Sequence, residues 1–351
     1  MSKETDKRHN WVHLSLEERQ TILANIADKK GIDDNAVEKD FWVSMVLKAL
    51  FSLPCSDGLV FKGGTSLSKG WDLIERFSED CDLAIDRAVL GFGKELNGTQ
   101  RNKLRKTSKK FVDNTLVGEL EKALNELELS GYFKLVNPPT KESDKDPVEF
   151  FVEYNSVLPE KNPYISESVK VEISCRSLTE PFELVEMRSM IEDAYPDEPF
   201  TEAPFDVPTV LPGKTFLEKI FLLHEEFNRP GGGTNIDRLT RHLYDIEKIM
   251  DKDFTTDAMK NESLYSDIVE HRSKFTAWSG LDYQGHHPST ISFLPPESLT
   301  KVLKEDYEKM REGFIYGEKK LTYEELITRI TVLQERFRKL ACNTSFFQRS
   351  R

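Results

Sequence analysis

The sequence has few cysteines, no long apolar run and no excess of positive charge. Its four cysteines are scattered, without a CxxC pair or the spacing of a disulfide framework, at Cys55, Cys81, Cys175 and Cys342. This usage favours a reducing compartment, so we expect a cytoplasmic protein. We find neither a signal peptide nor a run of about 18 apolar residues, and we expect no membrane partner. The net charge of −12 argues against a surface coated to bind nucleic acid without selectivity, although a local basic patch is compatible with it.

Length and composition allow a folded protein of one or two domains. The 351 residues are 38% hydrophobic and include 22 phenylalanines, which supports a sizeable core and argues against disorder. Val207-Pro208 and Pro212-Gly213 mark a change from a mixed α/β pattern to a helical one. We therefore expect an α+β fold with N-terminal helices over residues 1–55, a mixed domain over 56–207 and a helical domain over 208–351.

Hydrophobic periodicity predicts the individual elements. Capping-box spacing indicates two helix starts, at Ser15 with Glu18 and at Asn35 with Glu38. Further helices are predicted from Thr65 or Ser66 through Ile74, over 101–129, from Thr215, from Asp237 through Asp245, and over 257–277, 297–313 and 323–342. Strands are predicted over 132–136, 148–154 and 168–174, and a flexible glycine loop over 231–233.

The stretch from Phe61 to Ile85 carries the strongest functional signal. An apolar run ends at Gly63-Gly64, where a backbone without Cβ atoms can turn sharply and approach a ligand. The amides of such a turn, followed by the start of a helix, suit a phosphate. Considered alone, Gly-Gly-Thr is an ordinary turn, and it is not a Walker loop because Lys69 precedes Gly70.

A pair of aspartates follows the glycine turn. Asp80 and Asp82 lead into an apolar run, so on a strand their carboxylates would share one face and Cys81 would lie on the other. Mg²⁺ commonly takes one or two carboxylates together with phosphate oxygens of a substrate. Such a pair also occurs by chance in an acidic chain. Because it lies 16 residues after Gly64, the two features together predict one nucleotide site.

The order and detail of these residues resemble a known family. A glycine turn followed by D-x-D is similar to the signature of nucleotidyltransferases with a DNA polymerase β type of palm. Lys62 to Lys69 and Arg76 to Leu83 resemble, more closely, the K-G-G-T-x-L-S-K and R-F-S-E-D-x-D-L patterns of AbiEii/AbiGii-type toxins. Cys81 stands where that family more often has an aliphatic residue. The segment Glu38-Lys39-Asp40-Phe41-Trp42 extends the resemblance upstream, and in total it covers residues 35–340.

Two later segments also resemble motifs of this family. Glu218-Lys219-Ile220 is similar to E-K-[IL]-x-x-L, and the segment from Arg241 to Ile246 is similar to R-D-x-x-D-L. His242 replaces the first aspartate of the second motif, whereas Asp245 keeps the other. The resemblance implies functional roles for Lys219 and Asp245. A plain ion pair between neighbouring helices is the structural alternative.

The resemblance implies a magnesium-dependent nucleotidyltransferase toxin, with a palm over 56–207 and a helical region over 208–351 that completes the active site. Such an enzyme transfers a nucleoside monophosphate from a nucleoside triphosphate to RNA, with transfer RNA as the known acceptor class. It is paired with a separately encoded antitoxin, in abortive-infection defence against phage. The implied catalytic residues are Asp80, Asp82, Glu172, Lys219 and Asp245, of which Asp80, Asp82 and Glu172 would hold two magnesium ions. The implied nucleotide-binding residues are Lys62, Gly63, Gly64, Thr65, Ser78 and Lys219.

Glu172 is assigned from the strand predicted over 168–174. Alternation places Lys170 and Glu172 on one face of that strand and the valines and isoleucine on the other. The resemblance to palm enzymes implies a third carboxylate on a strand next to the aspartate pair, and Glu172 is the natural choice. A glutamate that simply faces solvent is the alternative.

A basic stretch is the candidate for binding RNA. The helix predicted over 101–129 begins with Arg101, Lys103, Arg105, Lys106, Lys109 and Lys110. In an acidic protein such a stretch suits contact with a phosphate backbone, while a solvated lysine-rich face is the alternative. The predicted RNA-binding residues are Lys106, Lys109, Lys110, Arg238 and Arg241.

Two other functions stay open. The same palm could modify a protein acceptor, and the labelled product would then be protein instead of RNA. The acidic residues could also be structural in a non-catalytic binding module, which would release no pyrophosphate in the presence of magnesium.

Overall fold

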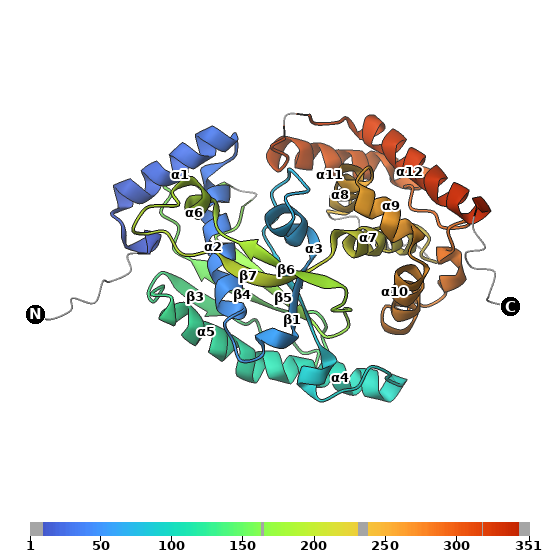
Figure 1. Cartoon of the computed structure of the whole chain (residues 1–351), viewed down its shortest axis with the longest axis horizontal. Helices are drawn as coiled ribbons and strands as arrows, with labels where there is room; N and C mark the ends of the chain where they lie inside the picture. Colours follow the sequence, from blue (N-terminus) through green and yellow to red (C-terminus); the bar gives the residue numbers. More distant parts are fainter. Residues whose placement is uncertain (1–9, 163–164, 231–237, 318, 344–351) are drawn as a thin grey trace, which may run out of the picture. The chain divides into compact units, whose positions relative to one another are not determined.

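The computed structural model describes residues 10–162, 165–230, 238–317 and 319–343 (Figure 1). The chain divides into two compact units. The first comprises Met1–Gly70 and Phe77–Thr209, and the second comprises Trp71–Arg76 and Val210–Arg351. The glycine loop predicted over 231–233, and Asp237, lie outside the described residues.

The first unit is built on a mixed sheet. Among the described residues, seven strands lie in the order β3-β4-β5-β2-β1-β7-β6 (Figure 1). They are β1 (Leu59–Lys62), β2 (Cys81–Ile85), β3 (Phe133–Val136), β4 (Val148–Tyr154), β5 (Ser168–Ser174), β6 (Phe182–Met187) and β7 (Phe205–Val210). β1 is antiparallel to β2 and parallel to β7, and β2 is parallel to β5. The mixed sheet with flanking helices confirms the predicted fold class.

Helix α2 (Asp34–Leu50) is the most deeply buried helix of the first unit. Its sequence is apolar around most of its circumference, and both Phe41 and Trp42 are buried, as expected for a helix without a solvent-facing side. The ring of Trp42 stacks on that of Tyr154 in β4, with centroids 5.3 Å apart. The elements that pack against α2 include β5, α1 (Leu16–Lys30), α5 (Val117–Glu126) and α6 (Met190–Ala194).

The basic segment is helical, as predicted. It forms α4 (Gly98–Phe111), a π-helical segment (Val112–Leu116) and then α5, so the helical stretch runs from Gly98 to Glu126. Asn97 caps it through a capping box with Gln100, so the helix begins at Gly98, three residues before the predicted start at Arg101. The strands that follow it, β4 and β5, have the predicted bounds.

The second unit is helical, which confirms the predicted C-terminal helical region. Its helices are α7 (Pro212–Phe227), α8 (Thr240–Ile249), α9 (Asp253–Lys260), α10 (Glu262–Phe275), α11 (Thr300–Gly313) and α12 (Tyr323–Asn343). α8 packs against α7, α11 and α12, while α7 also packs against α9 and α10. α7 and α8 therefore lie in the interior of this unit and can hold charged side chains out of solvent.

Two predicted helix starts are wrong. The box between Ser15 and Glu18 forms at the start of α1, but α2 is capped by Asp33. Asn35 lies inside α2, so its predicted box with Glu38 does not form. α7 begins at Pro212, because proline has no N–H to leave unsatisfied and its φ suits the first helical position. Thr215 is therefore already within the helix.

The helix predicted through Ile74 is also wrong. After Lys62 the chain forms only α3 (Gly63–Thr65) and a π-helical turn (Ser66–Gly70). Asp72 has a φ of 50°, which a continuing helix does not allow. The Trp71 indole donates to the carbonyl oxygen of Val210 at 3.0 Å, which holds this irregular segment within the second unit.

Two strands and one helix break were not predicted. β7 contains Pro208, which argues against a strand, and most side chains of β6 are exposed without alternation. The helix predicted over 257–277 is two helices, because Asn261 has extended backbone angles and its side chain caps α10. The two strands therefore depend on their neighbours in the sheet more than on local sequence, whereas the cap at Asn261 is a local feature.

Candidate active site

Gly63 is the residue that joins the glycine turn to the aspartate pair. Its φ of 85° lies in the region that favours glycine. A Cβ atom added at Gly63 would lie only 2.2 Å from Asp82 Oδ2, so no larger residue fits without displacing the carboxylate. Lys62, the last residue of β1, is paired in register with Asp82 of β2. The two halves of the sequence signature are therefore adjacent in the first unit.

The turn after Gly63 is held by hydroxyl groups. The hydroxyls of Thr65 and Ser78 share a hydrogen bond of 3.0 Å, in which either can donate. Ser66 Oγ donates to the carbonyl oxygen of Gly63 at 2.9 Å. No side chain caps the start of α3 at Lys62. Amides at the start of a helix that lack a capping partner can donate hydrogen bonds to a phosphate oxygen.

Asp80 lies immediately before β2 and is partly buried. Burial raises the pKa of its carboxyl, and the nearby charges of Asp82 and Glu79 raise it further, while Lys170 and Lys39 partly offset this. Cys81 is completely buried on the opposite side of the strand, as the alternation predicts. The carboxylates of Asp80 and Asp82 therefore repel each other in the absence of a cation.

Glu172 lies beside Asp82 in the sheet. Asp82 of β2 pairs with Glu172 of β5, which in turn pairs with Glu149 of β4, so the three carboxylates follow one line across the sheet. Lys170 forms an ion pair with Glu172 and its Nζ lies 3.3 Å from Glu149 Oε1. Burial alone would lower the pKa of Lys170, but Glu172, Asp80 and Glu149 raise it above its usual range.

Lys170 was not predicted to belong to the site. It lies two residues before Glu172, so the period of a strand already placed it on the same face. Within the described part of the chain, no group of three or more His, Cys, Asp or Glu side chains is arranged to hold a metal ion.

Asp245 of α8 is the centre of a charged cluster in the second unit. Its carboxylate is fully buried and accepts two hydrogen bonds from the Arg76 guanidinium, at 2.7 and 2.8 Å. Asp245 Oδ2 also lies 2.9 Å from Lys219 Nζ of α7. Burial alone would raise the pKa of Asp245, but the charges of Arg76 and Lys219 outweigh it and hold that pKa well below its usual range. This ion pair leaves both interpretations of Lys219 and Asp245 open.

His242 completes this group, which we call the Lys219 cluster (Arg76, Lys219, His242 and Asp245). His242 Nδ1 lies 3.2 Å from Lys219 Nζ. Burial, followed by the charge of Lys219, lowers the pKa of His242 to about 3. The imidazole is therefore neutral at pH 7 and accepts a hydrogen bond from the ammonium. Within this group, Arg76 and Lys219 both face the carboxylate of Asp245.

Arg76 was not predicted as a partner of Asp245. The two residues are 169 positions apart in the chain. The backbone of Arg76 forms an antiparallel bridge with Ile315, which ties this position to the segment after α11. No local sequence pattern relates these positions.

The predicted RNA-binding residues have different surroundings. On α4, Lys106 and Lys110 are exposed, whereas Lys109 pairs with Asp113 at 2.5 Å. In the second unit, Arg238 is exposed, and the guanidinium of Arg241 lies 5.2 Å from the centroid of the Phe314 ring. Of the three predicted residues on α4, Lys106 and Lys110 are therefore better placed than Lys109 to meet a phosphate backbone.

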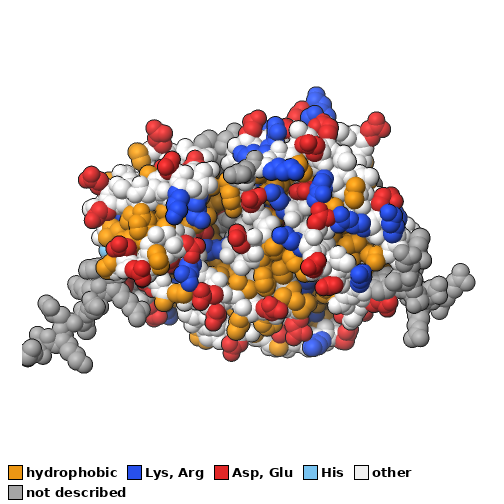
Figure 2. Space-filling view, turned by 45° about the horizontal axis from the view of Figure 1, so that its top comes forward, with side chains coloured by type: hydrophobic (Ala, Val, Ile, Leu, Met, Phe, Trp, Pro, Cys, Tyr) orange, Lys and Arg blue, Asp and Glu red, His pale blue; other side chains and the backbone are white. Residues whose placement is uncertain are grey.

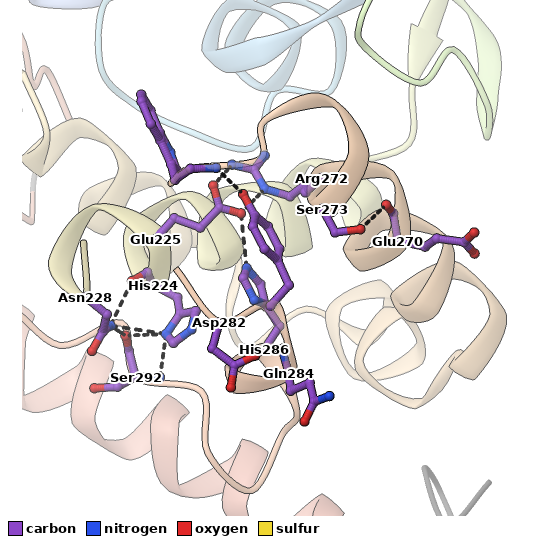
Figure 3. Close-up of polar contacts among 12 residues, drawn as sticks. His224, Glu225, Asn228, Glu270, Arg272, Ser273, Asp282, Gln284, His286 and Ser292 are labelled. Atoms are coloured by element: carbon purple, nitrogen blue, oxygen red, sulfur yellow. Dashed lines mark hydrogen bonds and ion pairs between the residues drawn. The ribbon is translucent and has the colours of Figure 1, made fainter. Parts of the chain in front are cut away.

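A second buried polar network lies in the second unit (Figure 3). Glu225 accepts two hydrogen bonds of 2.6 Å from Arg272 and lies 3.0 Å from His286 Nε2. The rings of His224 and His286 are 4.7 Å apart, and His224 Nδ1 lies 3.1 Å from the carbonyl oxygen of Ser292. Burial, followed by the charge of His286, lowers the pKa of His224 to about 4. This network holds α7 against α10 and the following segment.

Comparison with protein families identifies the chain. A family described as the nucleotidyl transferase AbiEii toxin of type IV toxin–antitoxin systems matches residues 46–339. The chain belongs to this family. It is therefore a nucleotidyltransferase toxin of a type IV toxin–antitoxin system, and membership implies a nucleoside triphosphate substrate and a cognate antitoxin. The resemblance predicted from Lys62–Lys69 and Arg76–Leu83 is confirmed.

A solved nucleotidyltransferase toxin shares the fold of this AbiEii family member. MenT4, a nucleotidyltransferase toxin of Mycobacterium tuberculosis H37Rv, is 18% identical with a TM-score of 0.50, and the match covers 92% of this chain and 90% of MenT4. JHP933 of Helicobacter pylori is 15% identical with a TM-score of 0.44, covering 88% of this chain and 94% of JHP933. No curated protein sequence matches this chain. None of the helices that the structure describes is long and apolar enough to span a membrane.

Proposed function

We propose that this AbiEii-type toxin transfers a nucleoside monophosphate from a nucleoside triphosphate to RNA, with a transfer RNA as the acceptor. The observation that carries the proposal is the contact between Gly63 and Asp82, which brings a phosphate-binding turn beside a pair of carboxylates. Scattered cysteines support a cytoplasmic site of action.

Asp80 and Asp82 would hold the magnesium ions. Both side chains are half-buried. Burial raises the pKa of Asp80 most, and repulsion from Asp82 raises it further. A bound cation would relieve this repulsion. Two carboxylates are the usual protein contribution to Mg²⁺ sites that substrate phosphates complete. When bound, Mg²⁺ supplies charge neutralisation of the triphosphate and the leaving pyrophosphate. Glu172, next to Asp82, is the proposed third carboxylate, and it would accept the proton of the acceptor hydroxyl.

Each unit offers groups that suit a nucleotide. In the first unit we assign phosphate binding to the amides of Gly63, Gly64 and Thr65, with Lys62 and the Ser78 hydroxyl beside them. In the second unit, Asp245 and His242 hold the Lys219 ammonium in place. A lysine ammonium that is already oriented suits the charge of a phosphate, which supports Lys219 as a phosphate-binding residue.

RNA binding needs a concentrated basic surface because the chain carries a net charge of −12. Figure 2 shows acidic and basic side chains interspersed on the visible face, so affinity for a phosphate backbone must come from a local group. Exposed Lys106 and Lys110 on α4 provide such a group. Changing both to glutamate should weaken RNA binding and flatten its salt dependence, because each lost phosphate contact removes the release of about one counterion.

The matched control for this helix changes two exposed lysines of α11, Lys301 and Lys309, to glutamate. It alters the net charge equally, so a general electrostatic effect would appear in both variants. Affinity for the triphosphate should be unchanged in each. If the salt dependence of RNA binding is the same in both variants and the wild type, α4 is only a solvated face.

The reaction is tested by incubating the protein with each labelled nucleoside triphosphate, Mg²⁺ and total RNA. Label in the transfer RNA fraction is the expected result. Label in protein would favour the protein-acceptor alternative. A complete lack of magnesium-dependent pyrophosphate release would favour the non-catalytic module.

A further inference from the structure

Helix α2 carries charged residues where an apolar helix is expected. Glu38, Lys39 and Asp40 are consecutive, and their exposed fractions are 1%, 1% and 8%. Successive helical residues point in different directions, and each of these side chains reaches a different segment of the first unit. Glu38 accepts hydrogen bonds from Ser156 Oγ at 2.5 Å and from the backbone N–H of Val157 at 2.9 Å.

Lys39 reaches the segment that ends in the aspartate pair. Its Nζ donates to Glu79 Oε2 at 2.6 Å and to Ser166 Oγ at 3.0 Å. Glu79 directly precedes Asp80 and is itself buried. The contact therefore fixes the chain one residue before the first proposed metal-binding carboxylate.

Asp40 reaches the other half of the signature. Its Oδ1 accepts from Lys69 Nζ at 2.7 Å, and its Oδ2 accepts from the backbone N–H of Met190 at 2.7 Å. Lys69 also donates to the carbonyl oxygen of Arg188 at 3.0 Å. Lys69 lies in the π-helical turn that follows the glycines, so Asp40 holds the end of the phosphate-binding turn.

Stability alone does not explain these contacts. The free-energy cost of moving two charges out of water offsets much of the attraction between them. Apolar residues of similar volume often stabilise a protein as well as a buried ion pair does, or better. Precise placement is needed nearby, because Gly63 and Asp82 approach too closely for even one methyl group between them. Through Lys39 and Asp40, α2 contacts both segments on which this approach depends.

We propose that Lys39 and Asp40 are positioning residues that fix the aspartate pair and the glycine turn relative to each other. Neither touches a substrate in this role. Lys39 acts through Glu79 on Asp80, and Asp40 acts through Lys69 on the glycine turn. The proposal rests on the proposed metal and triphosphate site. We expect loss of the Lys39 contact to weaken metal binding and loss of the Asp40 contact to weaken triphosphate binding.

The first experiment measures Mn²⁺ binding by electron paramagnetic resonance in the variant Lys39→Met/Glu79→Gln. This change removes one positive and one negative charge, so the net charge around Asp80 is preserved and only the contact is lost. We expect Mn²⁺ affinity to fall about tenfold, at the lower end of the loss seen when a partner that orients metal ligands is removed.

The control is Lys48→Met/Glu202→Gln, which removes an ion pair of 2.8 Å formed by the same helix. We expect wild-type Mn²⁺ affinity there. Wild-type affinity in the folded Lys39→Met/Glu79→Gln protein would overturn the role of Lys39. An equal loss in the control would show a general loosening of α2 and would overturn it as well.

The second experiment uses Asp40→Asn, which keeps the shape of the side chain and carries the test if the first variant does not fold. We expect weaker binding of a fluorescent nucleoside triphosphate analogue, with Mn²⁺ affinity close to wild type. Unchanged triphosphate affinity would overturn the role of Asp40. Asp82→Asn tests the proposed metal site itself, separately from the positioning residues. If this variant binds Mn²⁺ as tightly as the wild type, the proposed site is refuted.

Discussion

Changing Asp245 to asparagine is the sharpest test of how the Lys219 cluster is held together. The carboxylate of Asp245 is fully buried and forms ion pairs with both Arg76 and Lys219. Asparagine keeps the size of the side chain and removes its charge. The variant therefore leaves two buried cations facing each other, with His242 as a neutral neighbour.

The magnitude follows from the distances. With an effective dielectric constant of about 20, charges separated by the 2.9 Å between Lys219 Nζ and Asp245 Oδ2 attract by about 6 kcal/mol. Desolvation cancels much of this attraction, and removing one partner of a buried pair typically costs about 3–5 kcal/mol. At about 2–4 °C per kcal/mol, we expect the melting temperature of the second unit to fall by about 10 °C.

Calorimetry of the full chain measures this change, and a second substitution tests its cause. Adding Lys219→Met to Asp245→Asn removes the repulsion between the two cations and should recover about 1–3 kcal/mol. Lys219→Met alone should be mild, because Asp245 keeps its two hydrogen bonds from Arg76. A loss below about 1 kcal/mol in Asp245→Asn, or no recovery in the double variant, would refute the reasoning.

Three further predictions follow from charge and burial. Asp80→Asn should raise the metal-free melting temperature by about 2–4 °C by removing its repulsion with Asp82, and Mg²⁺ should cancel this gain because only the wild type binds it. Burial lowers the pKa of His224 from 6.5 to about 4, so the folded protein favours the neutral imidazole. The contribution of His224 to the free energy of unfolding is therefore complete above pH 6.5 and falls as the pH drops toward 4, by at most about 3 kcal/mol. A His224→Gln variant should lack this part of the acid sensitivity, and an unchanged pH profile would contradict the assignment. Lys219→Ala should weaken triphosphate affinity far more than it lowers the melting temperature, and the opposite pattern would reduce Lys219 to a structural ion pair.

The local part of the site could be predicted from the sequence. The turn at Gly63 and the carboxylates at Asp80 and Asp82 lie within one short stretch, and their spacing follows from strand and turn geometry. β4 and β5 were predicted with their bounds because they are bordered by polar or turn residues. β7 could not be predicted, because Pro208 disfavours a strand unless tertiary contacts impose one.

The partners of the site residues could be predicted only in part. The alternation of β5 already placed Lys170 on the face of Glu172. The contact between Arg76 and Asp245 joins positions 169 residues apart, and Lys39 meets Glu79 across 40 residues. Such pairs are set by the packing of whole helices, which a single sequence does not reveal. The charges of α2 appeared only as a family resemblance until their buried partners were visible.

We propose that Asp80 and Asp82 hold the magnesium ions for nucleotidyl transfer. Pyrophosphate release in the presence of RNA, a nucleoside triphosphate and saturating Mg²⁺ tests this proposal most directly, with the wild type compared with Asp80→Asn and Asp82→Asn. We expect release by the wild type, its loss without Mg²⁺, and its loss in both variants while their melting temperatures stay at or above that of the wild type. Wild-type release by both folded variants would contradict it.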